Sequence, residues 1–174
     1  MPLLEPHTLW HLTQTAGSDP GRFVADSAGQ AALGDLLSYG TIAAVERFRG
    51  QSLLVWCKRQ RAVVETLLQL DGAAARLVLC PSDFDVAHLA PAIAEADIDA
   101  IITDSTAFAE QAHDAKPIVF VENAARYALD PAMDRSLATE WVLFTSCTSD
   151  LPKLVAHTLG SLTGPVGDFH GKAL

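Results

Sequence analysis

The stretch that decides the fold is residues 52–105, SLLVWCKRQRAVVETLLQLDGAAARLVLCPSDFDVAHLAPAIAEADIDAIITDS. Short apolar runs at 53–57, 76–80 and 100–103 are separated by two longer segments in which apolar and polar residues mix. Runs of this length that are apolar throughout are typical of strands covered on both faces of a parallel sheet. The alternation predicts an α/β fold assembled from strand–helix–strand units.

The two segments between these runs show helical spacing of their apolar residues. The first has one core-facing stripe, and in the second Pro91 marks a point where a helix either begins or is broken. Apolar runs at 118–121 and 141–144 predict two further strands. We therefore expect a mainly parallel sheet with flanking helices and right-handed crossovers. The stripe residues are Val63, Val64, Leu67 and Leu70 in the first segment and Val86, Leu89 and Ile93 in the second.

Length and charge restrict the class of protein. A chain of 174 residues buries about 70% of its unfolded surface, so we expect a single domain over residues 1–174. Since no run approaches the roughly 18 consecutive apolar residues of a membrane helix, and no basic segment precedes a long apolar core near the N-terminus, we expect a cytoplasmic protein without a membrane span. The formal charge of −9 and the lack of a long basic run argue against a nucleic-acid partner.

The three cysteines are widely spaced and odd in number, which argues against a disulfide. Cys57 and Cys80 each close an apolar run, so we expect buried free thiols. Cys147 lies in a polar loop, and we interpret it as a substitution there rather than a nucleophile.

The histidines predict no metal site. His7 and His11 have the i, i+4 spacing of a helical metal pair, but no third ligand accompanies them. His157 follows an apolar pair, and we interpret it as a hydrogen-bonded histidine at a strand end rather than a catalytic base.

The stretch with recognisable chemistry is WVLFTSCTSDLPKLVAHT, residues 141–158. An apolar strand runs into a hydroxyl-rich turn that ends in Pro152 and Lys153. Backbone amides and hydroxyls in such a loop, together with an ammonium group, form a site for a polyphosphate. The loop follows the carboxyl end of a strand, where phosphate sites of α/β sheets lie. The Walker spacing is absent from the chain.

This loop resembles the phosphate-loop signature of the adenylate-forming enzymes (acyl-CoA synthetases, nonribosomal adenylation domains, luciferases), written T-S-G-T-T-G-x-P-K. Cys147 and Asp150 stand where the family has glycine. A Cβ costs about 1–2 kcal/mol wherever the left-handed backbone of a glycine is required, and Asp150 brings a carboxylate near the phosphate charge. We therefore interpret the loop as an impaired phosphate loop. The matching residues are Thr145, Ser146, Thr148, Ser149, Pro152 and Lys153.

The order of elements upstream also resembles the first part of the N-terminal domain of that family. Residues 6–26 resemble its opening helix and first strand, residues 37–50 its next helix, and residues 52–105 the run of strands and helices before the phosphate loop. Family members continue for several hundred residues past this loop, with the remaining substrate pockets and the catalytic lysine. The resemblance thus implies that this chain covers the first third of such an enzyme.

The resemblance implies ATP with Mg²⁺ as the cofactor and a carboxylate substrate and coenzyme A as partners. Thr145, Ser146, Thr148 and Ser149 would donate hydrogen bonds to the phosphates, and Lys153 would offset charge on the leaving pyrophosphate. No residue is assigned a catalytic role. The expected function is that of the N-terminal part of an AMP-forming carboxylate–CoA ligase, inactive on its own.

The alternative is a non-catalytic interaction or oligomerisation module derived from the same fold. An open sheet that stops at the phosphate-loop strand leaves an apolar edge uncovered, so we expect a homo-oligomer that buries residues 141–162.

Overall fold

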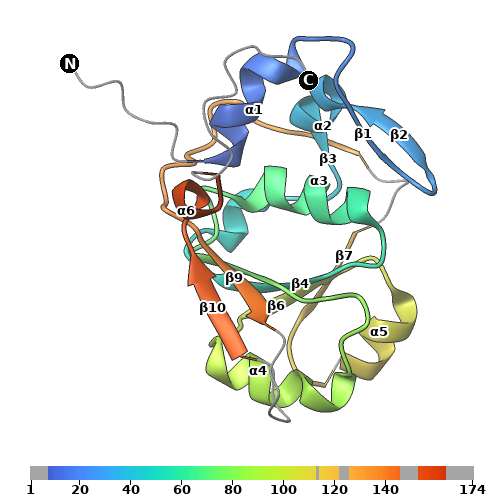
Figure 1. The fold of residues 1–174 in the computed structure, drawn as a ribbon, viewed down its shortest axis with the longest axis vertical. Helices are drawn as coiled ribbons and strands as arrows, with labels where there is room; N and C mark the ends of the chain where they lie inside the picture. The colour runs from blue at the N-terminus through green and yellow to red at the C-terminus, as the bar shows by residue number, and fades with distance from the viewer. Residues whose placement is uncertain (1–7, 113, 122–125, 146–152, 164–174) are drawn as a thin grey trace.

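The computed structural model describes residues 8–112, 114–121, 126–145 and 153–163 of the chain. A six-stranded sheet forms the centre of the fold, with helices on both of its faces (Figure 1). Its strands are β4 (Ser52–Trp56), β5 (Arg76–Leu79), β6 (Ala100–Thr103), β7 (Ile118–Phe120), β9 (Glu140–Thr145) and β10 (Lys153–His157).

The order of strands across the sheet is β10-β9-β5-β4-β6-β7. All neighbouring strands are parallel except β10, which pairs antiparallel with β9. The predicted apolar runs therefore became the five parallel strands, and the α/β fold with a mainly parallel sheet is confirmed.

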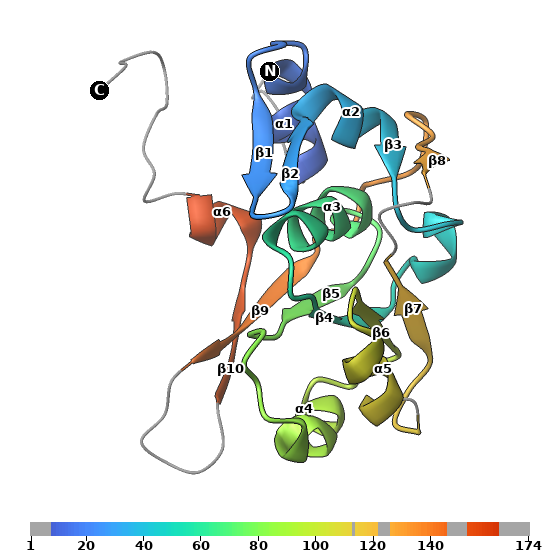
Figure 2. The same ribbon diagram turned by 90° about the vertical axis from the view of Figure 1, so that its right-hand side faces the viewer.

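The helices lie on opposite faces because the chain reverses its direction across the sheet. It passes from β4 to β5 in one direction and then from β5 over to β6 in the other. Parallel crossovers are right-handed, so connections that travel in opposite directions place their helices on opposite faces. Helix α3 (Gln60–Leu70) consequently covers one face, and α4 (Leu89–Glu95) and α5 (Thr106–Ala112) cover the other (Figure 2).

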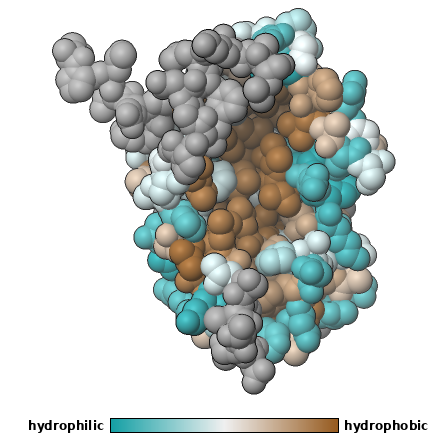
Figure 3. All heavy atoms as spheres, viewed as in Figure 1, coloured by the Kyte–Doolittle hydropathy of each residue, from teal (hydrophilic) through white to brown (hydrophobic). Residues whose placement is uncertain are grey.

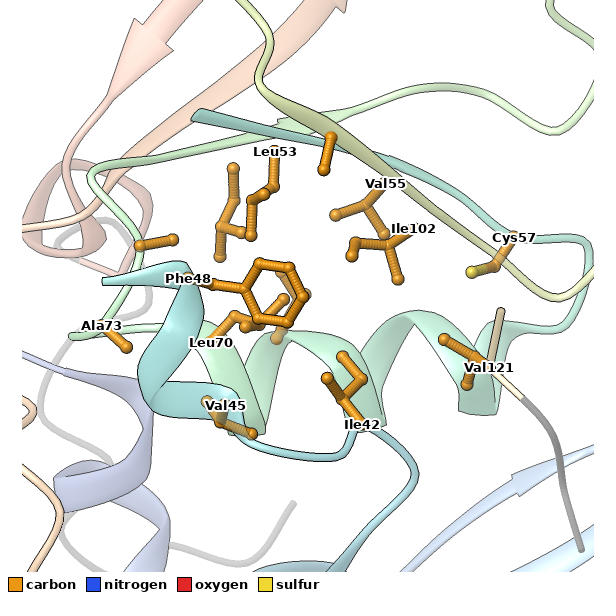
Figure 4. Close-up of a cluster of buried hydrophobic side chains, with 14 of the residues drawn as sticks. Ile42, Val45, Phe48, Leu53, Val55, Cys57, Leu70, Ala73, Ile102 and Val121 are labelled. Atoms are coloured by element: carbon orange, nitrogen blue, oxygen red, sulfur yellow. The ribbon is translucent and has the colours of Figure 1, made fainter. Parts of the chain in front are cut away.

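Side chains of the central strand β4 alternate between these two faces. Leu53 and Val55 pack in the cluster that includes α3, which Figure 4 shows, whereas Leu54 and Trp56 pack against α4 and α5. We call the two sides the α3 face and the α4/α5 face. Leu53 and Leu54 are fully buried, and burial of each such side chain contributes about 1.5–3 kcal/mol. A strand buried on both sides explains why the run 53–57 is apolar throughout.

A second layer lies beyond α3. It comprises α1 (Leu9–Gly17), the hairpin of β1 (Phe23–Asp26) and β2 (Gly29–Ala32), and α2 (Leu33–Ser38) (Figure 2). The two helices approach closely, since a Cβ on Gly34 would lie 2.8 Å from the carbonyl oxygen of Gly17. Thr8 caps α1 by accepting a hydrogen bond from the amide of His11.

The expected helix over 37–50 is wrong. Helix α2 ends at Ser38, and the short strand β3 (Tyr39–Gly40) then pairs with β8 (Tyr127–Ala128). A Cβ on Gly40 would lie 2.0 Å from Oε1 of Gln69, which accepts a bond from the amide of Ile42. Contact with the buried Gln69 therefore outweighs local helix propensity. Only one 3₁₀ turn, Val45–Phe48, follows.

Pro91 lies in the first turn of α4, where its missing amide leaves no helical bond unmade. A 3₁₀ turn at Val86–His88 precedes this helix. The chain after β10 enters a last short helix, α6 (Leu159–Thr163).

Among the described residues, none of the helices is both long and apolar enough to cross a membrane.

Candidate functional site

The predicted loop begins and ends at two paired residues, one on the outer strand β10 and one on its neighbour β9. Thr145 ends β9 and Lys153 begins β10, and the two are direct partners in the antiparallel register. The Thr145 hydroxyl donates a 3.2 Å hydrogen bond to the carbonyl oxygen of Lys153. Both side chains are exposed. The structure therefore brings together the two ends of the predicted phosphate loop.

The other predicted loop residues lie outside the described residues. Ser146, Thr148 and Ser149, which we expected to donate to phosphate, belong to this group. So do the two positions where glycine is expected, Cys147 and Asp150.

Thr145 and Lys153 lie on the α3 face of the sheet. Along β9, Trp141 packs on the α3 face and Val142 on the α4/α5 face. Side chains alternate along a strand, so Leu143 and Thr145 share the face of Trp141. Lys153, as the cross-strand partner of Thr145, lies on the same side. A hydroxyl and an ammonium group are thus placed side by side at one edge.

That edge is the carboxyl end of the parallel strands. Strand β9 is parallel to β5, which is parallel to β4. Ligands of open α/β sheets bind outside the carboxyl ends of the strands. Thr145 therefore lies at the carboxyl end of its strand, and its contact with phosphate stays a prediction.

An ion pair that the sequence analysis missed holds this edge together. Asp104, directly after β6, accepts bonds from the backbone amides of Lys58 (2.8 Å) and Arg59 (3.1 Å) and from Nε of Arg59 (2.9 Å). Its side chain is 1% exposed. This carboxylate therefore ties Arg59, through its amide and its side chain, to the end of β6. An aspartate immediately after an apolar run is the signal that could have indicated it.

Two aromatic contacts support the edge on the α4/α5 face. The rings of Trp56 and Phe108 stack with centroids 4.1 Å apart, and those of Phe84 and Phe144 lie 4.9 Å apart. Such pairs contribute about 0.5–1.5 kcal/mol beyond their burial. Phe144 precedes Thr145, so this packing fixes the strand that presents the hydroxyl.

The start of β9 is fixed from the α3 side by Asp71. This buried carboxylate accepts hydrogen bonds from the indole Nε1 of Trp141 (2.9 Å) and from the amide of Leu9. Burial raises the pKa of Asp71, and these donors lower it in part. The sequence pattern does not indicate this contact, because 70 residues separate its two partners.

The guanidinium of Arg135 lies on the same side of the fold. Its carbon is 4.1 Å from the centre of the Trp10 ring, and Nη1 donates to the carbonyl oxygen of Gln69 at 2.6 Å. This cation–π contact joins the segment before β9 to α1.

Cys57 and Cys80 are buried free thiols, as predicted. Burial raises the pKa of each thiol to about 12. A thiol that stays protonated near neutral pH is not a nucleophile.

The described residues contain no group of three or more His, Cys, Asp or Glu side chains suited to a metal ion. Nδ1 of His11 lies 2.6 Å from the Thr8 hydroxyl, and His7 lies outside the described residues. His157 ends β10, half-buried opposite Trp141.

No protein-family model matches the sequence, and neither does any curated protein. Solved structures with a similar fold include adenylate-forming enzymes. o-Succinylbenzoate CoA synthetase from Bacillus subtilis, in complex with the acyl-adenylate OSB-AMP, matches with a TM-score of 0.63 and 16% identity over 88% of this chain and 43% of that one. VinN matches with a TM-score of 0.63 and 18% identity over 92% of this chain and 47% of that one. The N-terminal subdomain of NpsA from Klebsiella oxytoca matches with a TM-score of 0.63 and 15% identity over 86% of this chain and 41% of that one.

This chain therefore has the fold of the N-terminal portion of adenylate-forming enzymes, as the sequence resemblance implied. It spans less than half the length of these three structures.

Proposed function

We propose that the connection between β9 and β10 binds the phosphate groups of ATP, in the manner of an acyl-CoA synthetase-like, AMP-forming carboxylate–CoA ligase. The observation that supports this proposal is the pairing of Thr145 with Lys153 at the carboxyl end of the sheet. The Thr145 hydroxyl can donate a hydrogen bond to a phosphate oxygen, and the Lys153 ammonium can offset phosphate charge. The two side chains lie on one face at the ends of a hydroxyl-rich loop, which suits a polyphosphate.

The two described ends of the loop would take different roles. The exposed ammonium of Lys153 would offset charge on the β and γ phosphates, and the exposed hydroxyl of Thr145 would turn from the Lys153 carbonyl to a phosphate oxygen. Ser146, Thr148 and Ser149 would add donors between them. Mg²⁺ would arrive with the nucleotide, since ATP-bound Mg²⁺ commonly keeps several waters and few protein ligands.

We further propose that this polypeptide binds nucleotide without forming an acyl-adenylate. That reaction needs a carboxylate held in line with the α phosphate and groups that stabilise the developing charge. The exposed polar side chains at the carboxyl edge include those of Thr145 and Lys153 and, after β4, Lys58, whereas Arg59 is paired with Asp104. They can contact phosphate oxygens, and we assign none of them to the carboxylate substrate. Binding of a carboxylate substrate and coenzyme A would need groups other than these described residues.

Titration calorimetry with ATP and Mg²⁺ tests the proposal. Lys153→Ala should weaken binding at least about tenfold, because a hydrogen bond to a charged group contributes about 1.5–3 kcal/mol. Lys116→Ala is the matched control, since Lys116 lies before β7 at the opposite edge of the sheet and should leave affinity unchanged. Equal affinities for the wild-type protein and Lys153→Ala would exclude phosphate binding at this loop. Carboxylate-dependent ATP–pyrophosphate exchange by the wild-type chain, lost in Lys153→Ala, would show that adenylate formation does occur.

A second candidate function is a non-catalytic assembly module. The exposed outer strand β10, with Val155 37% exposed, favours it. Absence of ATP binding combined with self-association would select this candidate over the first.

A further inference from the structure

The outer strand of the sheet is open on one side. β10 pairs with β9, and no other described strand pairs with its second edge. It has five residues, of which Lys153, Val155 and Ala156 are exposed. Outward-facing amides and carbonyls along such an edge form a template for another strand.

An apolar strip adjoins this edge on the α3 face. Leu79, Leu143 and Val155 are neighbours across β5, β9 and β10 in the strand register. None of the three is fully buried. Figure 3 shows apolar surface gathered in a hollow on this side of the molecule, below α3 as it is seen in Figure 1. Exposed apolar surface beside an open strand edge marks an interaction site.

We propose that a second copy of this chain pairs with β10 in antiparallel orientation, with the two-fold axis at Val155. The two sheets then continue as one. This register is self-complementary, as a two-fold interface requires. Val155 meets its own equivalent, Lys153 of one copy lies opposite His157 of the other, and Leu154 lies opposite Ala156. The apolar strips of both copies join across the axis.

The distribution of charge favours a second copy over a charged partner. The chain has a formal charge of −9, so two copies repel over most of their surface. Residues 153–163 contain no Asp or Glu, and Lys153 is their one Lys or Arg. Two acidic chains can therefore approach along β10 without opposing carboxylates. A strongly basic partner would find no carboxylate on this strand, and a strongly acidic one would find only Lys153.

The opposite face of the strand has a hollow that suits the same partner. It has a volume of about 190 Å³ and is lined by Val142, Leu154 and Ala156, with Arg76 and Glu95 beside them. Its apolar lining rather than its rim favours a partner, because Arg76 is already paired with Glu140 at 2.7 Å.

Charge substitution at the axis tests the proposal. Val155→Lys and Val155→Glu each place two like charges opposite one another, which destabilises a pair of strands. Wild-type protein should be a dimer by light scattering at micromolar concentration, and each variant alone a monomer. An equimolar mixture of the two variants should recover the dimer, because opposite charges then meet. Phe23→Lys is the control, since Phe23 on the β1–β2 hairpin is 59% exposed and lies away from β10.

Amide hydrogen exchange supplies a readout that needs no variant. Protection of the β10 amides should rise with protein concentration in the wild-type chain. A wild-type monomer at micromolar concentration, a dimer that persists in both Val155 variants, or β10 exchange that is independent of concentration would overturn the proposal. These results do not depend on ATP, so failure of nucleotide binding remains distinguishable from failure of this interface.

Discussion

Replacement of Asp104 by alanine tests how the candidate site is held together. The buried Asp104 carboxylate accepts three hydrogen bonds, from the amides of Lys58 and Arg59 and from the Arg59 side chain. These bonds tie the carboxyl ends of β4 and β6. Alanine removes all three acceptor contacts and leaves the partly buried amide of Arg59 without its partner.

The expected loss of stability follows from these contacts. A hydrogen bond to a charged group contributes about 1.5–3 kcal/mol. Lys58 is exposed and the Arg59 side chain is 25% exposed, so water replaces part of what Asp104 supplies. We therefore expect the free energy of unfolding to fall by about 3 kcal/mol, less than three full bonds. For a domain of this length, that loss lowers Tm by about 6–12 °C.

Urea unfolding followed by tryptophan fluorescence measures this loss. Asp99→Ala is the matched control. Asp99 precedes β6, whereas Asp104 follows it, and the Asp99 carboxylate accepts one backbone hydrogen bond, from the amide of Ser52 at 2.9 Å. Its expected cost is about 1 kcal/mol. An Asp104→Ala protein whose unfolding free energy equals that of the Asp99→Ala control would refute the reasoning.

Two further predictions concern the anchor of β9 and the loop. Burial raises the pKa of Asp71 in the folded state. As pH rises, the unfolded chain releases the Asp71 proton from about pH 4, whereas the folded protein keeps it to a higher pH. The contribution of Asp71 to the free energy of unfolding therefore falls as pH rises. Asp71→Asn should remove that decline in paired urea titrations at several pH values, and an unchanged slope would contradict it. Restoring glycine at Cys147 and Asp150 together should raise ATP affinity in calorimetry more than either change alone, because neighbouring sites couple. The gain from Asp150→Gly should shrink with added salt, and weaker or unchanged ATP binding in the double variant would count against a phosphate site.

The parallel strands were predictable because their signal is local. The runs at 53–57 and 100–103 are apolar throughout, and the structure buries β4 and β6 on both faces. The α3 stripe was predictable for the same reason, since its period of 3.6 residues is written in one segment.

The phosphate-loop prediction was local as well, because it was read from one stretch of the sequence. Thr145 ends β9 and is paired with Lys153, the first residue of β10, and phosphate binding by these residues stays a prediction. The expected helix over 37–50 failed because Gln69, far along the chain, binds the amide of Ile42.

What the sequence alone determined was the alternation of strands and helices, the burial of Cys57 and Cys80, and the loop with its hydroxyls and lysine. Strand order, the Asp104 clamp and the contact of Asp71 with Trp141 were decided only by the tertiary structure. The physical reason is the range of the interactions. Periodicity records which face of an element is buried, whereas pairing between elements depends on contacts across tens of residues, whose loop-closure cost only the complete core offsets.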